Sequence, residues 1–167
     1  SLDATRVAIG SRYNDDAGLN SGHVRVYEYD AGIGIWDQVG TDINGESAGD
    51  NFGASIALSK DGTYIAIGAP FHGTKDTGSV RIFRESSGVW NTVGNELVGM
   101  SEHDWIGRKV AMSPTNYIRV AIAGLSHDSR GVKSGVVRVY FYVRPSEQRP
   151  TGQWMQLGAD ITDASAG

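Results

Sequence analysis

The sequence predicts an all-β protein built from three tandem repeats, each of four short antiparallel strands. The first observation behind this prediction is that apolar stretches recur in fixed order, at offsets of 58 and then 55 residues. The second is that glycine supplies 23 of the 167 residues, which indicates many turns. The third is that no apolar spacing typical of a helix runs along the chain.

Three strands of each repeat have their own sequence landmark. The second strand is apolar on both faces, as expected for a strand packed between two neighbouring sheets. The third alternates apolar and polar residues around an arginine, and the fourth begins with tryptophan and ends with glycine. The equivalent positions are Val7, Ile65 and Val120 in the second strand, Arg25, Arg81 and Arg138 in the third, and Trp36, Trp90 and Trp154 in the fourth.

The first strand occurs only twice, as NFGASIALS from Asn51 and as WIGRKVAMS from Trp105. Three repeats should therefore contain eleven strands rather than twelve. We divide the chain into residues 1–50, which lack the first strand, and residues 51–104 and 105–167. In the middle repeat, Asp61-Gly62 supplies a two-residue turn with positive φ that joins the first two strands directly.

Four-stranded antiparallel sheets that repeat in this way are typical of β-propeller blades. Phe52 and the three repeated tryptophans should pack between blades, where each buried ring contributes on the order of 2 to 3 kcal/mol. Closed propellers use roughly four to eight blades. We therefore expect a larger propeller, completed either by further blades of the same polypeptide or by association of separate copies.

The motifs resemble a known family of propeller repeats. Phe52-Gly53, followed one hairpin later by Gly68-Ala69-Pro70, resembles the FG-GAP repeat of integrin-alpha-type β-propellers. The third copy is degraded to Ile106-Gly107 and Ala123-Gly124-Leu125, and the first keeps only Gly10-Ser11-Arg12. The sequence of residues 40–70 is also similar to tandem FG-GAP repeats in large secreted or surface proteins of microalgae and marine microbes.

This resemblance implies a noncatalytic adhesion or scaffold module located outside the cell or on its surface. Many members of the family bind calcium in an Asp-rich loop between the first two strands. Here that loop is only Ser59-Lys60-Asp61-Gly62, which offers too few carboxylates. We therefore expect a plain β-turn there and no cofactor, with calcium as the alternative that the missing loop disfavours.

Composition and motifs exclude several other functions. The net charge of −4 gives no positive surplus for nucleic acid, and no apolar run approaches the roughly 18 residues of a membrane helix. The chain has no cysteine, and no nucleophile elbow or phosphate-binding loop appears. The histidines lack metal-ligand spacing, although their convergence in three dimensions stays open. We predict neither catalytic nor metal-binding residues. The four histidines are His23, His72, His103 and His127.

A carboxylate repeats with the same period as the arginine of the third strand. The three are Asp42, Glu96 and Asp160. We predict that each pairs with the arginine of its own blade, mainly setting register, since a partly exposed pair contributes only about 0.2 to 1 kcal/mol. The alternative is a ring of arginines that binds anions.

Variable loops indicate where a binding surface would lie. The loops between strands two and three differ among repeats, and in a propeller they share a face with the connections between blades. Neutral drift of exposed loops is the alternative explanation. The candidate binding residues are Asn14, Asp15, Asp16, His72, Lys75, Asp76, His127, Asp128, Arg130 and Trp105.

Two functions follow from these observations. We expect a noncatalytic structural or adhesive module that assembles with protein partners or further blades. The alternative is a carbohydrate-binding or glycan-processing propeller that stacks sugars on aromatic rings of the loop face. Trp36, Trp90 and Trp154 are explained by packing between blades, so Trp105 is the residue that separates the two functions.

Overall fold

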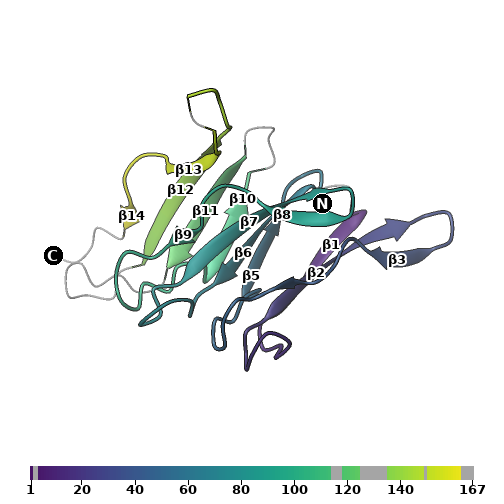
Figure 1. Cartoon of the computed structure of the whole chain (residues 1–167), viewed down its shortest axis with the longest axis horizontal. Helices are drawn as coiled ribbons and strands as arrows, with labels where there is room; N and C mark the ends of the chain where they lie inside the picture. Colours follow the sequence, from purple (N-terminus) through teal and green to yellow (C-terminus); the bar gives the residue numbers. More distant parts are fainter. Residues whose placement is uncertain (2–3, 114–117, 125–134, 149, 163–167) are drawn as a thin grey trace.

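A computed structural model describes residues 1, 4–113, 118–124, 135–148 and 150–162, and this part of the chain is entirely β. Fourteen strands form three antiparallel sheets that stand side by side, which we call blades one, two and three (Figure 1). The described residues contain no helix, so none of them forms a helical membrane span.

Each blade follows the same strand order, and its last short strand returns to pair with the third strand. Blade one contains β1 (Arg6–Ser11), β2 (His23–Asp30), β3 (Ile35–Gln38) and β4 (Ile43–Asn44). Blade two contains β5 (Ser55–Leu58), β6 (Tyr64–Ala69), β7 (Ser79–Ser86), β8 (Val89–Thr92) and β9 (Leu97–Val98). Blade three contains β10 (Lys109–Met112), β11 (Arg119–Gly124), β12 (Val136–Val143), β13 (Gln153–Gln156) and β14 (Ile161–Thr162).

The fourth strand of every blade is divided in two, which explains why fourteen strands stand where the sequence predicts eleven. In blade two, β8 pairs with Phe83–Ser86 of β7, whereas β9 pairs with Ser79 and Val80 at its other end. The break contains Gly94, whose φ of +72° turns the chain out of the ladder. Gly40 and Gly158 have the same conformation in the other blades.

The register of strands two and three is identical in the three blades. In each, the arginine of the third strand stands opposite an isoleucine of the second, so the arginines are equivalent in space as well as in sequence. These pairs are Ile9 with Arg25, Ile67 with Arg81 and Ile122 with Arg138.

Glycines of the FG and GAP motifs let neighbouring blades approach closely. A Cβ added at Gly10 would lie 2.3 Å from the carbonyl oxygen of Gly53 in blade two. A Cβ added at Gly68 would lie 2.0 Å from the carbonyl oxygen of Gly107 in blade three. The FG glycines of blades two and three therefore rest on the second-strand glycine of the preceding blade, where a larger residue would force the sheets apart.

Tryptophans of the fourth strand also link successive blades. Trp90 Nε1 donates to the carbonyl oxygen of Val39 at 2.8 Å, and Trp154 Nε1 donates to that of Val93 at 2.7 Å. Each acceptor lies in the preceding blade. The predicted packing of these two rings between blades is confirmed, whereas Trp36 of blade one remains half exposed beside Tyr29.

Apolar cores fill the two junctions between blades. The ring of Phe52 is fully buried between blades one and two and meets the edge of Phe83 at 6.3 Å between centroids. Ile106, at the equivalent position, is fully buried between blades two and three. The role predicted for Phe52 as an apolar plug is therefore confirmed.

The predicted pairing of arginine with carboxylate is confirmed in blades one and three. Arg25 donates from Nε to both oxygens of Asp42 at 2.9 Å and from Nη2 to Oδ2 at 2.7 Å. Arg138 pairs with Asp160 at 3.0 Å and is fully buried. Because Arg138 is buried, the alternative of an exposed ring of arginines receives no support.

In blade two this prediction is wrong, because Arg81 does not pair with Glu96. Its guanidinium lies 4.4 Å from the centre of the Phe52 ring, forms an ion pair with Glu46 of blade one and donates to the carbonyl oxygen of Asn44 at 3.2 Å. The aromatic face attracts the cation and directs it across the junction. Blade three has no such arrangement, since Ile106 replaces the ring.

Candidate functional site

Loops at one end of the blades form the candidate site. We call "loop face" the β1–β2 and β6–β7 loops, residues 12–22 and 70–78, with the β4–β5 and β9–β10 connections, residues 45–54 and 99–108. Backbone hydrogen bonds join each loop to the connection that follows it. They run from Gly49 N to Leu19 O at 2.8 Å, from Asn51 N to Asn20 O at 3.0 Å, from His103 N to Lys75 O at 2.9 Å and from Trp105 N to Asp76 O at 3.2 Å.

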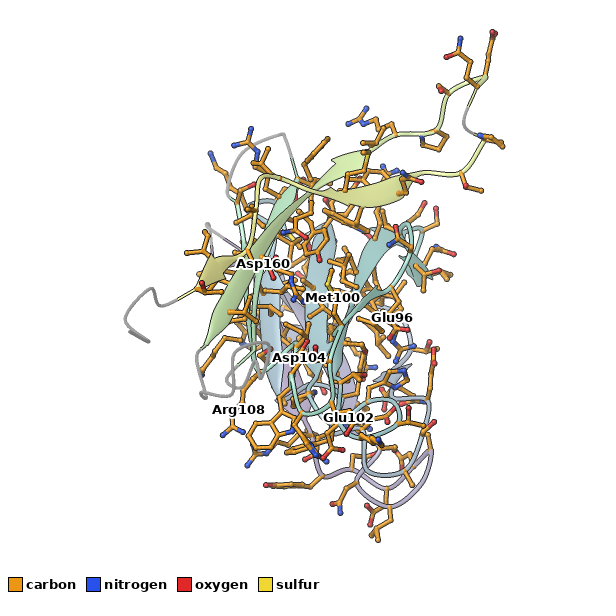
Figure 2. All side chains as sticks on the ribbon, turned by 90° about the vertical axis from the view of Figure 1, so that its left-hand side faces the viewer. Glu96, Met100, Glu102, Asp104, Arg108 and Asp160 are labelled. Atoms are coloured by element: carbon orange, nitrogen blue, oxygen red, sulfur yellow. The ribbon has the colours of Figure 1, made fainter. Side chains whose placement is uncertain are left out.

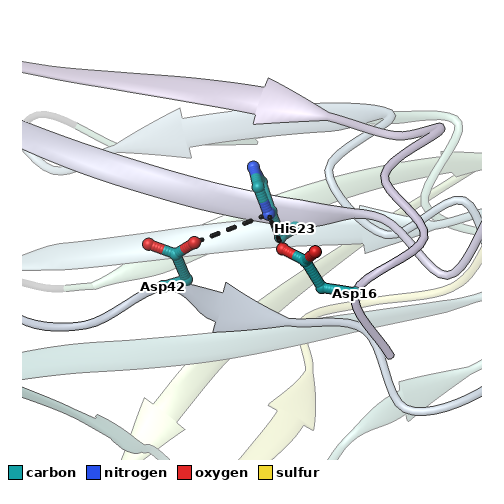
Figure 3. A group of neighbouring side chains, drawn as sticks. All are labelled: Asp16, His23 and Asp42. Atoms are coloured by element: carbon teal, nitrogen blue, oxygen red, sulfur yellow. Dashed lines mark ion pairs between the residues drawn. The ribbon is translucent and has the colours of Figure 1, made fainter. Parts of the chain in front are cut away.

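The candidate binding residues Asn14, Asp15 and Asp16 lie in the β1–β2 loop, but their side chains have different partners. Asn14 Oδ1 accepts a hydrogen bond from Asp16 N at 2.9 Å, and Asp15 Oδ1 accepts one from Asn20 N at 2.7 Å. These two side chains therefore shape the loop itself. The exposed carboxylate of Asp16 instead points toward His23 (Figure 3).

The predicted residues of the blade two loop pair with the connections around them. His72 Nδ1 lies 2.9 Å from Oδ2 of the buried Asp50, which precedes blade two. Lys75 forms an ion pair with Glu102. Asp76 lies 3.8 Å from the Nδ1 of His103. The structure thus brings these three residues to one end of the molecule, where each side chain already has a partner.

Trp105 closes the junction between blades two and three at the loop face. Its φ of +49° is a left-handed conformation that bulky residues rarely adopt. The ring meets the edge of Phe71 at 6.0 Å, and the guanidinium of Arg108 lies 5.5 Å from its centre. Figure 2 shows Arg108 with Glu102 at the lower end of the sheets, on the far side of Asp104 from Asp160.

The remaining predicted residues, His127, Asp128 and Arg130, lie outside the described residues.

The structure adds a cluster that the sequence does not reveal. Asp16, His23 and Asp42 meet in blade one, where His23 Nδ1 lies 3.4 Å from Asp16 Oδ2 and 3.6 Å from Asp42 Oδ2 (Figure 3). Hydrogen bonds from Arg25 and then Gln38 lower the pKa of Asp42 to about 2, against the smaller opposing effect of burial. Asp42 is therefore ionised at neutral pH.

The FG-GAP repeat family model matches residues 44–83, which run from β4 into β7. This segment is an FG-GAP repeat. No curated protein matches the chain significantly. The FG-GAP segment contains Phe52-Gly53 and Gly68-Ala69-Pro70, the residues that plug and space the junctions between blades.

One signal in the sequence distinguishes His23 from its counterparts, although it does not name the partners of His23. His23 occupies the position held by Ser79 in blade two and by Val136 in blade three. A histidine that replaces small or apolar residues at a repeated, buried position indicates a role that is specific to its own blade. Spacing between histidines could not find it, because the two partners are carboxylates from other segments.

Proposed function

We propose that this chain is a noncatalytic structural module of a secreted or cell-surface protein. Its task in this proposal is assembly with another blade of the same repeat type, which requires no chemistry at the loop face. The proposal rests on the unequal exposure of equivalent residues in blades one and two.

Blade one presents outward the surface that blade two buries. Val7 and Ile9 are 37% and 54% exposed, whereas their equivalents Ile65 and Ile67 are fully buried against blade one. Trp36 is 45% exposed, whereas its equivalent Trp90 donates across the junction. Exposed apolar surface of this kind marks an interaction site, and its match to an existing junction indicates a blade as the partner.

Blade three carries the complementary half of that junction. Leu157 and Gly158 correspond to Val93 and Gly94, which receive the ring of Trp154. Leu157 is exposed, and a Cβ added at Gly158 would meet none of the described residues within 4 Å. Leu157 and Gly158 can therefore receive the tryptophan of a further blade, which comes either from a second copy or from elsewhere in the polypeptide.

The native mass of the chain tests this proposal. We expect wild type to associate with increasing concentration in light scattering coupled to gel filtration, and Ile9→Lys to shift it toward the monomer. Met100→Lys is the matched control, because Met100 is exposed on the loop face instead. A wild type that is monomeric throughout, or equal masses for the two variants, would contradict assembly through this face.

Glycan binding is the competing function, and it depends on Trp105. Phe71 and Arg108 already contact its ring, which leaves less of the aromatic surface for a sugar. This arrangement favours the structural module. A glycan array in which wild type binds a sugar and Trp105→Ala does not would reverse that preference.

A further inference from the structure

His23 is a buried histidine, and one of its two ring nitrogens, Nδ1, lacks a hydrogen bond. The residue is 4% exposed, and its Nδ1 forms no hydrogen bond within the described part of the chain. A buried polar atom left in this way costs free energy unless a further partner satisfies it. Figure 3 shows that this nitrogen points at the two carboxylates of Asp16 and Asp42.

The spacing of these three groups suits a metal ion. Their ligand atoms all lie within 4.8 Å of one another. The two distances from His23 Nδ1, 3.4 and 3.6 Å, match the separation of about 3.3 Å between two ligands of a tetrahedral ion with bonds of about 2.05 Å. The exposed side chain of Asp16 can move to complete the shell, since no described neighbour buries it.

We propose that Asp16, His23 and Asp42 bind a divalent transition-metal ion of the Zn²⁺ class. Imidazole nitrogen with carboxylate oxygen suits ions of intermediate softness, whereas calcium and magnesium prefer shells made entirely of oxygen. Three protein ligands also leave a position for water. The site lies where the β1–β2 loop, the start of β2 and the β3–β4 connection of blade one meet.

Residues around Asp42 orient its carboxylate for this task. Arg25 donates from Nε and Nη2, and Gln38 Nε2 donates to Oδ1 at 2.8 Å. A carboxylate has about four lone-pair directions, so Oδ2 can serve a metal while it accepts from Arg25. Such outer partners fix the ligand, although the nearby positive charge lowers the affinity for a cation.

The site is a property of blade one and not of the repeat. Blades two and three retain a carboxylate at the position of Asp42, namely Glu96 and Asp160, but have Ser79 and Val136 in place of His23. Replacing His23 by serine therefore substitutes the residue that blade two already accommodates. This makes His23→Ser the natural test variant.

Calorimetric titration of the metal-free chain with Zn²⁺ measures this binding directly. We expect wild type to bind one ion, and His23→Ser and Asp16→Asn each to lose more than about tenfold in affinity. Asp16 is exposed, so its variant tests the site even if His23→Ser unfolds. The matched controls are His103→Ser and Asp37→Asn, which alter an exposed histidine and an exposed aspartate elsewhere, and both should bind as wild type does.

Thermal unfolding provides a second readout. Zn²⁺ should raise the Tm of wild type and of both controls but not of the two site variants, because binding to the native state alone stabilises it. Wild type that binds no Zn²⁺ up to about 1 mM, site variants that bind as tightly as wild type, or tighter binding of Ca²⁺ than of Zn²⁺ would each overturn the proposal.

Discussion

Replacing Gly68 by alanine tests whether backbone contact between glycines sets the distance between blades. Gly68 is the penultimate residue of β6, and its φ lies outside the left-handed region, so alanine is compatible with its backbone. The added methyl group would, however, point at Gly107 of blade three, and would also lie 2.5 Å from Oγ of Ser55 in its own blade. The substitution therefore separates steric collision, chiefly with the backbone of blade three, from any change in backbone preference.

The size of the effect follows from the distances. The new Cβ would lie 2.0 Å from the carbonyl oxygen of Gly107, whereas real Cβ atoms essentially never come closer than 3.0 Å, so blade three would have to move by about 1 Å. Overpacking of this kind costs about 1 to 3 kcal/mol. The displacement also strains the hydrogen bond from Ser55 Oγ to the same oxygen, at 2.6 Å. We expect a loss of about 3 kcal/mol in the free energy of unfolding.

Urea unfolding followed by tryptophan fluorescence measures this loss, because Trp90 and Trp154 both lie at blade junctions. Gly135→Ala is the matched control: among the described residues its Cβ would meet only Gly124 O at 3.6 Å, and its φ also lies outside the left-handed region. The control should stay within about 0.5 kcal/mol of wild type. Equal stability of Gly68→Ala and Gly135→Ala would refute the reasoning.

Two further substitutions test the junctions and the turns. Trp154→Phe leaves the Val93 carbonyl without its donor and should lower the free energy of unfolding in urea by about 1 to 3 kcal/mol. Trp36→Phe, at the exposed equivalent position, should change this free energy little. Similar losses in the two variants would argue against a stabilising hydrogen bond. Burial raises the pKa of Asp61, but hydrogen bonds from Ser59 and Thr63 outweigh it and hold that pKa below 3.8. The stability from ionised Asp61 is therefore present above about pH 4 and lost as the pH falls through its native pKa. Asp61→Asn should flatten the acid limb of a plot of urea midpoint against pH, and parallel limbs would exclude this role.

The regular parts of the fold were predictable because each blade repeats the same pattern. The apolar second strand and the alternating third strand identify β6 and β7 directly, and the rings of Phe52 and Trp154 fill the junctions as their positions indicate. The division of the fourth strand was not predictable in the same way, since it depends on the positive φ that Gly94 adopts within the ladder.

Contacts between different segments were harder to predict. The choice of Arg81 between Glu96 and Glu46 depends on the ring of Phe52 beneath its guanidinium, which comparison of repeats cannot reveal. The loop face was foreseeable as a region, but the meeting of His23 with two carboxylates depends on how the β1–β2 loop folds back. The sequence shows that His23 differs from its counterparts in the other blades, but it does not show which side chains surround His23.

Main-chain atoms make the closest contacts at the junctions between blades, through the glycines and through carbonyl groups that accept from tryptophan, and buried apolar side chains fill the space beside them. The spacing of successive blades thus does not depend on the side chains that vary in the loops. We expect whole blades to be exchangeable between positions, each carrying its own loop chemistry, so that new surfaces can arise by duplication without any redesign of the scaffold.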